Sequence, residues 1–377
     1  MTLVFFLCAG FLVYAVVGWP LLLGILARLY GRPALRDAVT RPVTVIIAVY
    51  NGERYLRAKL DSVFALDYPR DQLQVFVVSD GSTDATDRIA ESYDAVRLIR
   101  IEKGGKCKAL NASIPLATGE ILFLTDVRQE LEANCLRELV SYYGDPEVGA
   151  VSGELLIRDG DSRGSRDVGV YWRIETWIRD QLSSIDSMFG ATGPVYTIRR
   201  SLAVPIPEEI LLDDMYLPLS AFFRGYRLKM ARGAIAWDYA TSTQTEFLRK
   251  VRTLGGNFQL LTYYPQLLIP FTNRMWFHYM SYKFLRILMP WLLLGAVISS
   301  LWLPAPWNWL MLAGFFAAVL IALVDSKIPQ SSPLKKLTSP LATFLTMMLA
   351  AMLALRVFFV DPRSLWIVTS AKKDGKL

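Results

Sequence analysis

The sequence predicts an α/β domain with a Rossmann-like, mainly parallel sheet, joined to transmembrane α-helices. From Val43 onward, short apolar runs of strand length alternate with helical patterns, which is typical of a parallel sheet. The stretch from Leu3 to Ala27 contains no charged residue, and about 20 apolar residues suffice to cross a bilayer. With 377 residues, 53% of them hydrophobic, the chain is long enough for both parts.

Further apolar stretches follow the α/β region. Ile287–Leu303 and Trp307–Val324 are separated by a Pro-Ala-Pro segment, which predicts two antiparallel membrane helices. Leu341–Val360 carries Arg356 and either spans the bilayer, re-enters it or lies at its cytoplasmic interface. The first stretch is not expected to be a cleaved signal peptide, because no basic segment precedes it.

These patterns predict five regions along the chain. They are an N-terminal transmembrane helix (1–30), an α/β domain (38–260), an interfacial amphipathic helix or short linker (262–283), C-terminal transmembrane or re-entrant helices (284–361) and a tail (362–377).

The formal charge of +7 is concentrated beside the apolar stretches. Arginines follow the first stretch and lysines follow the third, so the positive-inside rule places residues 28–283 in the cytoplasm of a multi-pass cytoplasmic membrane protein. The lysines of the tail favour a cytoplasmic tail as well. Basic residues there would also attract membrane lipids, whereas no nucleic-acid-binding module is recognisable. The basic residues concerned are Arg28, Arg32, Arg36, Arg41, Lys327, Lys335 and Lys336.

Cysteine and histidine usage excludes several enzyme classes. The three cysteines form no CxxC pair, so buried or idle thiols are expected. The single histidine, His278, lies outside the α/β region. Ser–His–Asp hydrolases and His-ligated zinc sites need a histidine within the domain, so both are excluded.

Each element of the α/β region has its own signal. Strands are apolar runs, and the first helix has apolar residues at the spacing of one buried face, Leu56, Leu60 and Val63. The expected strands are 43–49, 75–79, 96–101, 121–124 and 148–152, with further pieces near 193–198, Leu228 and Ile235; the expected helices start near 53, 84, 106, 168 and 214.

Acidic residues end two of the buried strands. Asp80 and Asp126 each follow an apolar run, and in an open α/β sheet ligands bind at the carboxyl ends of the strands. Asp80 could accept from a base or a ribose hydroxyl, and Asp126 could hold a divalent cation on a diphosphate. The alternative for both is an ordinary turn or helix-capping aspartate. Neither a GxGxxG fingerprint nor a Walker motif is present.

The adjacent acids Asp213 and Asp214 follow a buried apolar stretch. Such a pair can supply a general base, and mutual repulsion can raise the pKa of one member. The alternative is a pair of helix-start acids favoured by the helix dipole.

Taken in order, these motifs resemble glycosyltransferase family 2, the membrane-bound inverting enzymes that include cellulose, chitin and hyaluronan synthases. The resemblance covers residues 43–260 and extends to the flanking apolar stretches. Its motifs are Tyr50-Asn51-Gly52-Glu53, Asp80-Gly81-Ser82, Lys103-Gly-Gly-Lys106, Asp126-Val-Arg128, Gly190-Ala-Thr-Gly193, Asp213-Asp214 and Arg249-Lys-Val-Arg252.

The resemblance implies a GT-A fold, a nucleotide-diphosphate-sugar donor (UDP-sugars first) and a divalent cation, Mn²⁺ or Mg²⁺. It assigns Asp214 as general base, with Asp213 beside it. The other implied roles are donor binding by Tyr50, Glu53, Asp80, Lys106, Asp126 and Arg128, metal binding by Asp126, and contacts with acceptor and diphosphate by Gly193, Arg249, Arg252 and Thr253.

Two positions depart from the family pattern. Arg128 replaces the second acid of the metal motif; a guanidinium cannot bind a metal but can bind a phosphate. Thr253 replaces an aromatic residue that offers a flat shelf for a sugar. We therefore expect a lipid-linked or short saccharide acceptor. A processive polysaccharide synthase, acting as a homo-oligomer or with synthase subunits, and a non-catalytic nucleotide-sugar-binding protein remain alternatives.

Overall fold

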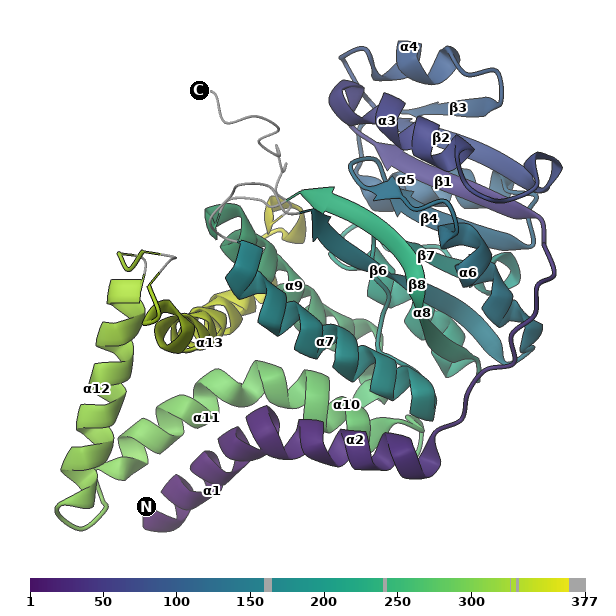
Figure 1. Ribbon diagram of the computed structural model, residues 1–377. Coiled ribbons are helices and arrows are strands. Elements are labelled where there is room, and N and C mark those ends of the chain that lie inside the picture. Colours follow the sequence, from purple (N-terminus) through teal and green to yellow (C-terminus); the bar gives the residue numbers. More distant parts are fainter. Residues whose placement is uncertain (159–164, 240–242, 326, 330–331, 366–377) are drawn as a thin grey trace. The chain divides into compact units, whose positions relative to one another are not determined.

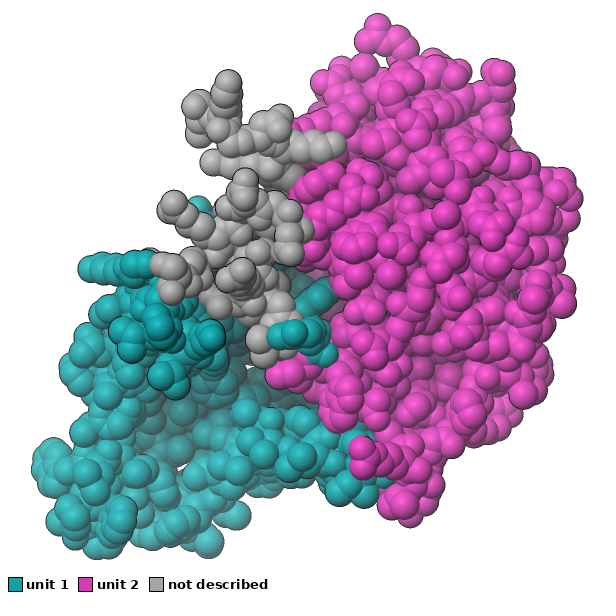
Figure 2. Space-filling view, viewed as in Figure 1, with its two compact units in different colours: residues 1–25, 161–173, 241–377 teal, residues 26–160, 174–240 magenta. Residues whose placement is uncertain are grey.

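The computed structural model describes residues 1–158, 165–239, 243–325, 327–329 and 332–365. The chain forms two compact units, which Figure 2 shows in different colours. Unit 1 comprises residues 1–25, 161–173 and 241–377, and unit 2 comprises residues 26–160 and 174–240. Each unit is described by itself below.

Unit 2 contains one eight-stranded mixed sheet with the order β3-β2-β1-β4-β7-β6-β8-β5 (Figure 1). The neighbours β3-β2, β2-β1, β1-β4 and β6-β8 are parallel, and the other pairs are antiparallel. The predicted α/β class is confirmed. The strands are β1 (Val43–Val49), β2 (Leu73–Asp80), β3 (Val96–Ile101), β4 (Ile121–Asp126), β5 (Glu130–Leu131), β6 (Val148–Arg158), β7 (Tyr196–Arg199) and β8 (Arg227–Tyr239).

Helices cover both faces of this sheet, so six of the seven residues of β1 are buried. Helix α5 packs on β1 to β3, while α6 and α8 pack on β6 and β8. The helices are α3 (Glu53–Phe64), α4 (Thr86–Glu91), α5 (Lys106–Ser113), α6 (Cys135–Ser141), α7 (Ser165–Ile185, beginning in unit 1) and α8 (Asp213–Phe223); short 3₁₀ turns are η2 (Arg70–Gln72), η3 (Ile114–Leu116), η4 (Tyr142–Gly144) and η5 (Arg200–Leu202).

Most strand expectations agree with the structure, with one difference near the C-terminal edge of the sheet. The two pieces expected near Leu228 and Ile235 are one strand, β8. Its pairing with β6 shifts register between Ser152 and Glu154, so the strand bends without ending. The irregularity interrupts the apolar alternation that sequence reasoning relies on.

Unit 1 is helical, and four of its described helical stretches are long and apolar enough to cross a membrane: Thr2–Tyr30, which continues into unit 2, Trp276–Ser300, Trp307–Asp325 and Lys335–Phe358. Its elements are α1 (Thr2–Val13), η1 (Tyr14–Gly18), α2 (Trp19–Tyr30), α9 (Thr243–Tyr263), η6 (Pro265–Leu268), α10 (Trp276–Tyr279), η7 (Met280–Phe284), α11 (Leu285–Ser300), α12 (Trp307–Asp325), α13 (Lys335–Ala354), η8 (Leu355–Phe358) and η9 (Pro362–Leu365).

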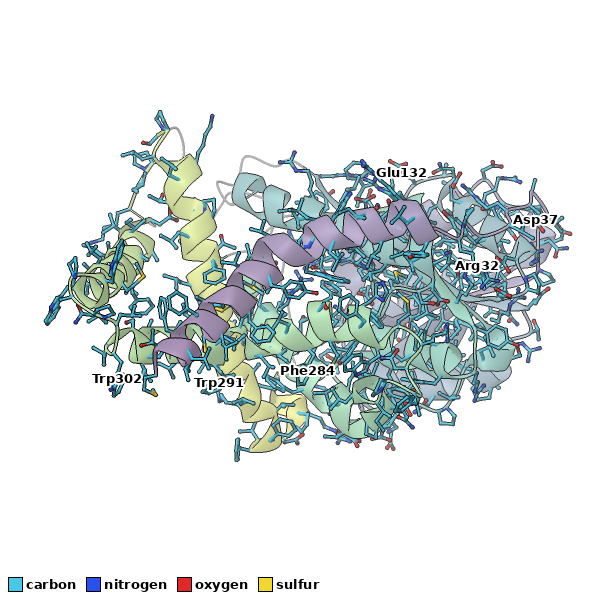
Figure 3. The ribbon with its side chains drawn as sticks, turned by 90° about the horizontal axis from the view of Figure 1, so that it is seen from below. Arg32, Asp37, Glu132, Phe284, Trp291 and Trp302 are labelled. Atoms are coloured by element: carbon cyan, nitrogen blue, oxygen red, sulfur yellow. The ribbon has the colours of Figure 1, made fainter. Side chains whose placement is uncertain are left out.

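The helices of unit 1 pack through apolar side chains. Helices α1 and α11 lie side by side, as do α12 and α13 (Figure 1). A buried cluster joins α9, α11 and α13 through Val251, Leu254, Ile287, Ala350, Ala351 and Ala354. By contrast, Trp291 on α11 and Trp302 in the following turn are exposed (Figure 3).

The expectation of one amphipathic helix over residues 262–283 is wrong. Helix α9 ends at Tyr263, and a 3₁₀ turn follows at Pro265–Leu268. Proline lacks the N–H that a continuing helix needs. The side chain of Asn273 then accepts from the backbone N–H of Met275 at 3.0 Å, and the long apolar helix starts at Trp276, eleven residues before the predicted position. The predicted α/β region extends to residue 260, whereas residues 243–260 cluster with unit 1. The tail beyond Leu365 lies outside the described residues.

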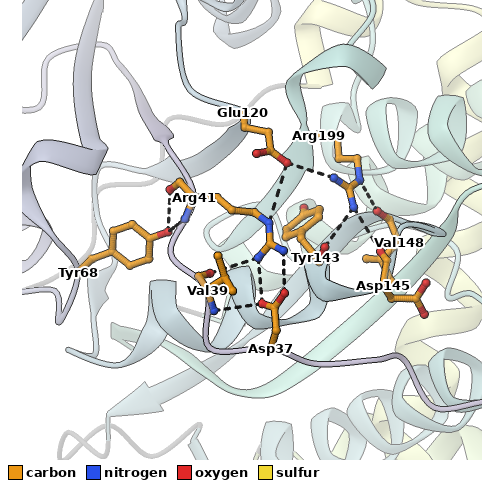
Figure 4. Close-up of polar contacts among 9 residues, drawn as sticks. All are labelled: Asp37, Val39, Arg41, Tyr68, Glu120, Tyr143, Asp145, Val148 and Arg199. Carbon is orange, nitrogen blue, oxygen red and sulfur yellow. Dashed lines mark hydrogen bonds and ion pairs between the residues drawn. The ribbon is translucent and has the colours of Figure 1, made fainter.

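The segment between α2 and β1, which belongs to unit 2, is held in place by ion pairs of its own arginines. Three of the four arginines that predicted the membrane orientation are paired with carboxylates. Near its end, Arg41 binds Asp37 at 2.8 Å, and the hydroxyl of Tyr68 accepts from the Arg41 N–H (Figure 4). The other two pairs are Arg32–Glu147 and Arg36–Glu138.

Candidate functional site

The carboxyl ends of β1, β2 and β4 meet at one edge of the sheet. Because β1 lies between β2 and β4, Val49 pairs with Ser79 and Ala48 pairs with Asp126. The turn that starts at Tyr50, the acid Asp80 and the acid Asp126 therefore lie at the same edge, where ligands bind in open α/β sheets.

Lys106 joins two of the predicted acids at this edge. Its Nζ lies 3.0 Å from Oδ1 of Asp126 at the end of β4, and 3.1 Å from Oδ2 of Asp213 at the start of α8. The side chain of Asp213 is only 5% exposed, whereas that of Asp126 is 38% exposed. Residues from three parts of the chain thus form one charged cluster with an open side at Asp126.

The cluster has a strong electrostatic effect on its own members. Burial favours the neutral amine of Lys106, but Asp126, Asp213 and Asp214 outweigh it and raise the lysine's pKa above its ordinary value. Beneath them, burial and the same three carboxylates raise the pKa of Tyr196 well above its ordinary value. Its hydroxyl is buried without a hydrogen-bond partner among the described residues, so it is a neutral donor near three acids.

Asp214 is packed against the predicted glycine loop. A Cβ at Gly193 would lie 2.9 Å from Oδ2 of Asp214, and the backbone N–H of Ala191 donates to the Asp214 carbonyl at 2.7 Å. At Gly190, φ is +113° and a Cβ would meet Met215 at 2.4 Å. Both glycines are needed for this close approach, which explains their spacing in the motif.

Asp80 binds backbone rather than pointing freely into the site. Its two carboxylate oxygens accept from the N–H groups of Gly104 and Gly105 at 2.7 and 2.8 Å. Gly105 precedes α5, whose first residue is Lys106. In this structure Asp80 therefore fixes the loop that presents Lys106, and its predicted role in reading a base stays a prediction.

The two turns after β1 and β2 are hydrogen-bonded to each other. Oδ1 of Asn51, which has φ of +48°, accepts from the N–H of Thr83 at 2.8 Å. The N–H of Glu53 donates to Asp84 at 3.0 Å, and Oε2 of Glu53 accepts from the N–H of Ala85 at 3.0 Å. Glu53, which was predicted to bind the nucleotide-sugar, thus stabilises the neighbouring turn in this structure.

Tyr50 remains accessible on this edge. The residue is 37% exposed, and Nζ of Lys103 lies 4.1 Å from the ring centroid and 3.0 Å from the hydroxyl. A flat ring beside a cation can accommodate the planar base of a nucleotide.

The structure assigns Arg128 to a buried ion pair. Its Nη2 lies 2.5 Å from Asp238 on β8, and the two side chains are 9% and 1% exposed. Gln129 donates to the same carboxylate at 2.8 Å. In this structure the pair anchors the turn after β4, and the predicted contact of Arg128 with a donor phosphate stays a prediction.

Three predicted residues lie on a helix of the other unit. Arg249, Arg252 and Thr253 belong to α9 in unit 1. Arg249 is paired with Glu246 at 2.9 Å, one helical turn away. Their predicted contacts with acceptor and diphosphate therefore stay predictions.

Sequence reasoning missed Lys59. This lysine of α3 is fully buried and donates to Oγ1 of Thr125 at 2.6 Å and to the carbonyl of Gln129 at 2.7 Å. A signal was present, because position 59 falls on the apolar face defined by Leu56 and Val63, where a charged residue is unusual.

Burial lowers the pKa of Lys59 and of Lys229 on β8 to about 7. Between pH 7 and the ordinary lysine pKa of 10.5, the unfolded chain therefore holds more protons than the folded one. Stability should rise with pH in this window, by up to about 1.4 kcal/mol per unit for each group. Denaturation of the detergent-solubilised chain between pH 7 and 8.5 measures the slope, and K59M should reduce it by about half. An unchanged slope in K59M would contradict the assignment.

The fold has a counterpart among known proteins. Residues 44–203 match the family described as Glycosyl transferase family 2. Among solved structures, the mannosyltransferase PcManGT from Pyrobaculum calidifontis, determined with GDP-Man and Mn²⁺, is similar with a TM-score of 0.72 and 24% identity, covering 94% of this chain and 99% of that one.

Curated relatives point the same way. Probable glycosyltransferase YdaM of Bacillus subtilis is 25% identical over 236 residues, covering 57% of this chain and 55% of the relative. A beta-monoglucosyldiacylglycerol synthase of Nostoc sp. is 26% identical over 186 residues, covering 46% and 40%. The poly-beta-1,6-N-acetyl-D-glucosamine synthase of Staphylococcus aureus is 24% identical over 229 residues, covering 58% and 55%. The chain thus spans about half the length of these relatives.

The chain is thus similar in fold to a solved mannosyltransferase and similar in sequence to glycosyltransferases, and its residues 44–203 match the family described as Glycosyl transferase family 2.

Proposed function

We propose that the chain is a membrane-embedded, inverting glycosyltransferase that moves a sugar from a nucleotide-diphosphate-sugar to a lipid-linked or saccharide acceptor. The observation that carries this proposal is the cluster of Lys106, Asp126 and Asp213 at the carboxyl edge of the sheet, with Asp214 next in the chain. It combines an open carboxylate, a fixed cation and a second acid within one site.

In inverting sugar transfer, Asp214 and Lys106 would have separate roles. The acceptor hydroxyl attacks the anomeric carbon while the bond from that carbon to the diphosphate oxygen breaks on the opposite face. Asp214 takes the hydroxyl proton, and the nucleoside diphosphate leaves with the bonding electron pair. The ammonium of Lys106 lies beside the carboxylates, and from there it would stabilise the negative charge that develops on the leaving phosphate.

The residues present fit a divalent cation that is held mainly by the donor. Among the described residues, no group of three or more His, Cys, Asp or Glu side chains gathers as a closed metal site. Mg²⁺ and similar ions are often bound by one or two carboxylates together with substrate phosphates and water. Asp126 would be that carboxylate, and the cation would supply charge neutralisation at the diphosphate.

We expect EDTA to lower sugar transfer at least tenfold and added Mn²⁺ or Mg²⁺ to restore it. A parallel titration of Mn²⁺ followed by its EPR signal should show that D126N binds the ion more weakly than the unmodified chain. Full transfer in the presence of chelator would show that the charge is neutralised by protein cations, first of all Lys106.

The experiment that tests the function is a screen of activated sugars. A donor that binds raises the midpoint of thermal unfolding with the logarithm of its concentration. UDP-sugars are the first choice and GDP-sugars the second, in the presence of Mn²⁺. Donors that bind are then incubated with membranes. If no donor binds and no sugar is transferred, the proposal is wrong.

Product length separates single transfer from polymerisation. Thr253 stands where the processive relatives carry an aromatic residue, so we expect addition of one or a few sugars. A ladder or polymer would instead favour a processive synthase.

Localisation follows from the helices. Four described helices are long and apolar enough to cross a membrane. With arginines after the first of them, we propose a multi-pass protein of the cytoplasmic membrane with its catalytic unit in the cytoplasm.

A further inference from the structure

Lys59 is a polar residue on the buried face of the amphipathic helix α3. The other side chains that α3 buries are Leu56, Leu60 and Val63, and Lys59 is as fully buried as they are. Burying an amino group is costly unless it is well hydrogen-bonded. A methionine of similar length would fill the same space without that cost. The contacts that the amino group makes should therefore explain why the position holds a lysine.

Those contacts enclose the turn that presents Asp126. Lys59 donates to the Thr125 hydroxyl at 2.6 Å, one residue before Asp126, and to the Gln129 carbonyl at 2.7 Å, three residues after it. On the far side, the Gln129 side chain donates to Asp238 on β8 at 2.8 Å. The turn is thus held from α3 and from β8, while the carboxylate of Asp126 remains partly exposed.

The same hydrogen bonds continue to the loop that packs on the proposed base. The Thr125 hydroxyl, which accepts from Lys59, donates to the carbonyl of Pro194 at 2.6 Å. Pro194 follows Gly193, the residue whose Cβ position lies 2.9 Å from Oδ2 of Asp214. One buried amino group is therefore connected through one hydroxyl to both acidic parts of the site.

We propose that Lys59 is a positioning residue, which fixes the turn bearing Asp126 and the loop 190–194 against Asp214 so that the two acids keep one spacing. The inference rests on the proposed function, since it assigns the spacing to donor and acceptor chemistry. Side chains that orient directly acting groups typically change activity or metal affinity about 10- to 100-fold when they are removed.

Thr125 offers a matched pair of variants for the test. Thr125→Val keeps the shape but loses both hydrogen bonds, whereas Thr125→Ser keeps the hydroxyl. We expect kcat to fall about 10- to 100-fold in T125V and in K59M, with a smaller change in the donor KM, and to return to within about threefold in T125S. In the double variant K59M/T125V, kcat should fall little further than in either single variant, because both substitutions remove the hydrogen bond between Lys59 and Thr125.

A core variant separates positioning from plain destabilisation. Val63→Ala removes buried methyl groups from α3 but none of the hydrogen bonds that hold the turn, so it should lower stability while kcat is preserved. If V63A, at a matched loss of stability, lowers kcat as much as K59M does, or if T125S behaves as T125V does, the positioning role is overturned.

Hydrogen exchange gives a readout that needs no sugar transfer. In K59M and T125V, peptides that cover 123–130 and 190–195 should exchange about tenfold faster, while those of α6 stay unchanged. If both peptides keep their protection, Lys59 does not position them and the inference fails, whatever the enzyme does. If they exchange faster but the unmodified chain transfers no sugar, the proposed function fails instead.

Discussion

Replacing Asp214 with asparagine should lower kcat about 10²- to 10⁴-fold, the range that a positioned general base supplies. Asparagine has the same shape, so the close approach of Gly193 to this side chain is preserved. It cannot take the proton of the acceptor hydroxyl. Initial rates of transfer at saturating donor and acceptor measure the effect, and the donor KM should change little.

The neighbouring acid provides the control. Asp213 is paired with Lys106 at 3.1 Å and is almost fully buried, so D213N should act through the charge of the cluster and raise the donor KM. If D213N abolishes turnover and D214N does not, the base is Asp213. If turnover of every donor is unaffected in both variants, the catalytic assignment is wrong and a non-catalytic binding protein becomes the better interpretation.

Replacing Lys106 with methionine should reduce both stability and transfer. The loss leaves Asp126 and Asp213 without their shared counter-charge. Removing one partner of a fully buried pair costs about 3–5 kcal/mol, and because Asp126 is 38% exposed we expect about 2 kcal/mol. Transfer should fall about 10²-fold in kcat/KM, because a fixed charge near the leaving diphosphate is lost. Chemical denaturation and initial rates measure the two effects.

Two lysine variants sharpen this test. K103M removes a cation from the same loop, but one whose ammonium contacts only Tyr50 among the described pairs, so stability should be unchanged. K106R keeps the charge in a larger side chain and should recover part of the stability. If K103M and K106M lose stability and transfer activity equally, the pairing of Lys106 with Asp126 and Asp213 contributes nothing specific.

The strands and the acidic edge were predictable because they depend on local patterns. Short apolar runs ended by Asp80 or Asp126 identify buried strands and also the edge at which they end. The partners of those acids depend on pairings between distant segments. That Asp80 would bind the N–H groups of Gly104 and Gly105, or that Arg128 would be buried against Asp238, 110 residues away, has no local signal.

The helix expected at 262–283 shows a second reason why prediction from the sequence fails. Its composition is amphipathic, but Pro265 and the turn around Asn273 end one helix and start the next. The composition of the segment does not reveal these helix ends, which depend on the missing N–H of Pro265 and on the turn in which Asn273 accepts from the N–H of Met275.

The mutual hydrogen bonds of Asn51, Glu53, Thr83 and Ala85 have a practical consequence for engineering. A chimaera that grafts one of these two turns from a relative with another donor would leave the remaining turn with mismatched partners. Exchange of sugar or base preference should therefore be attempted by transplanting residues 50–54 and 80–86 as a single cassette.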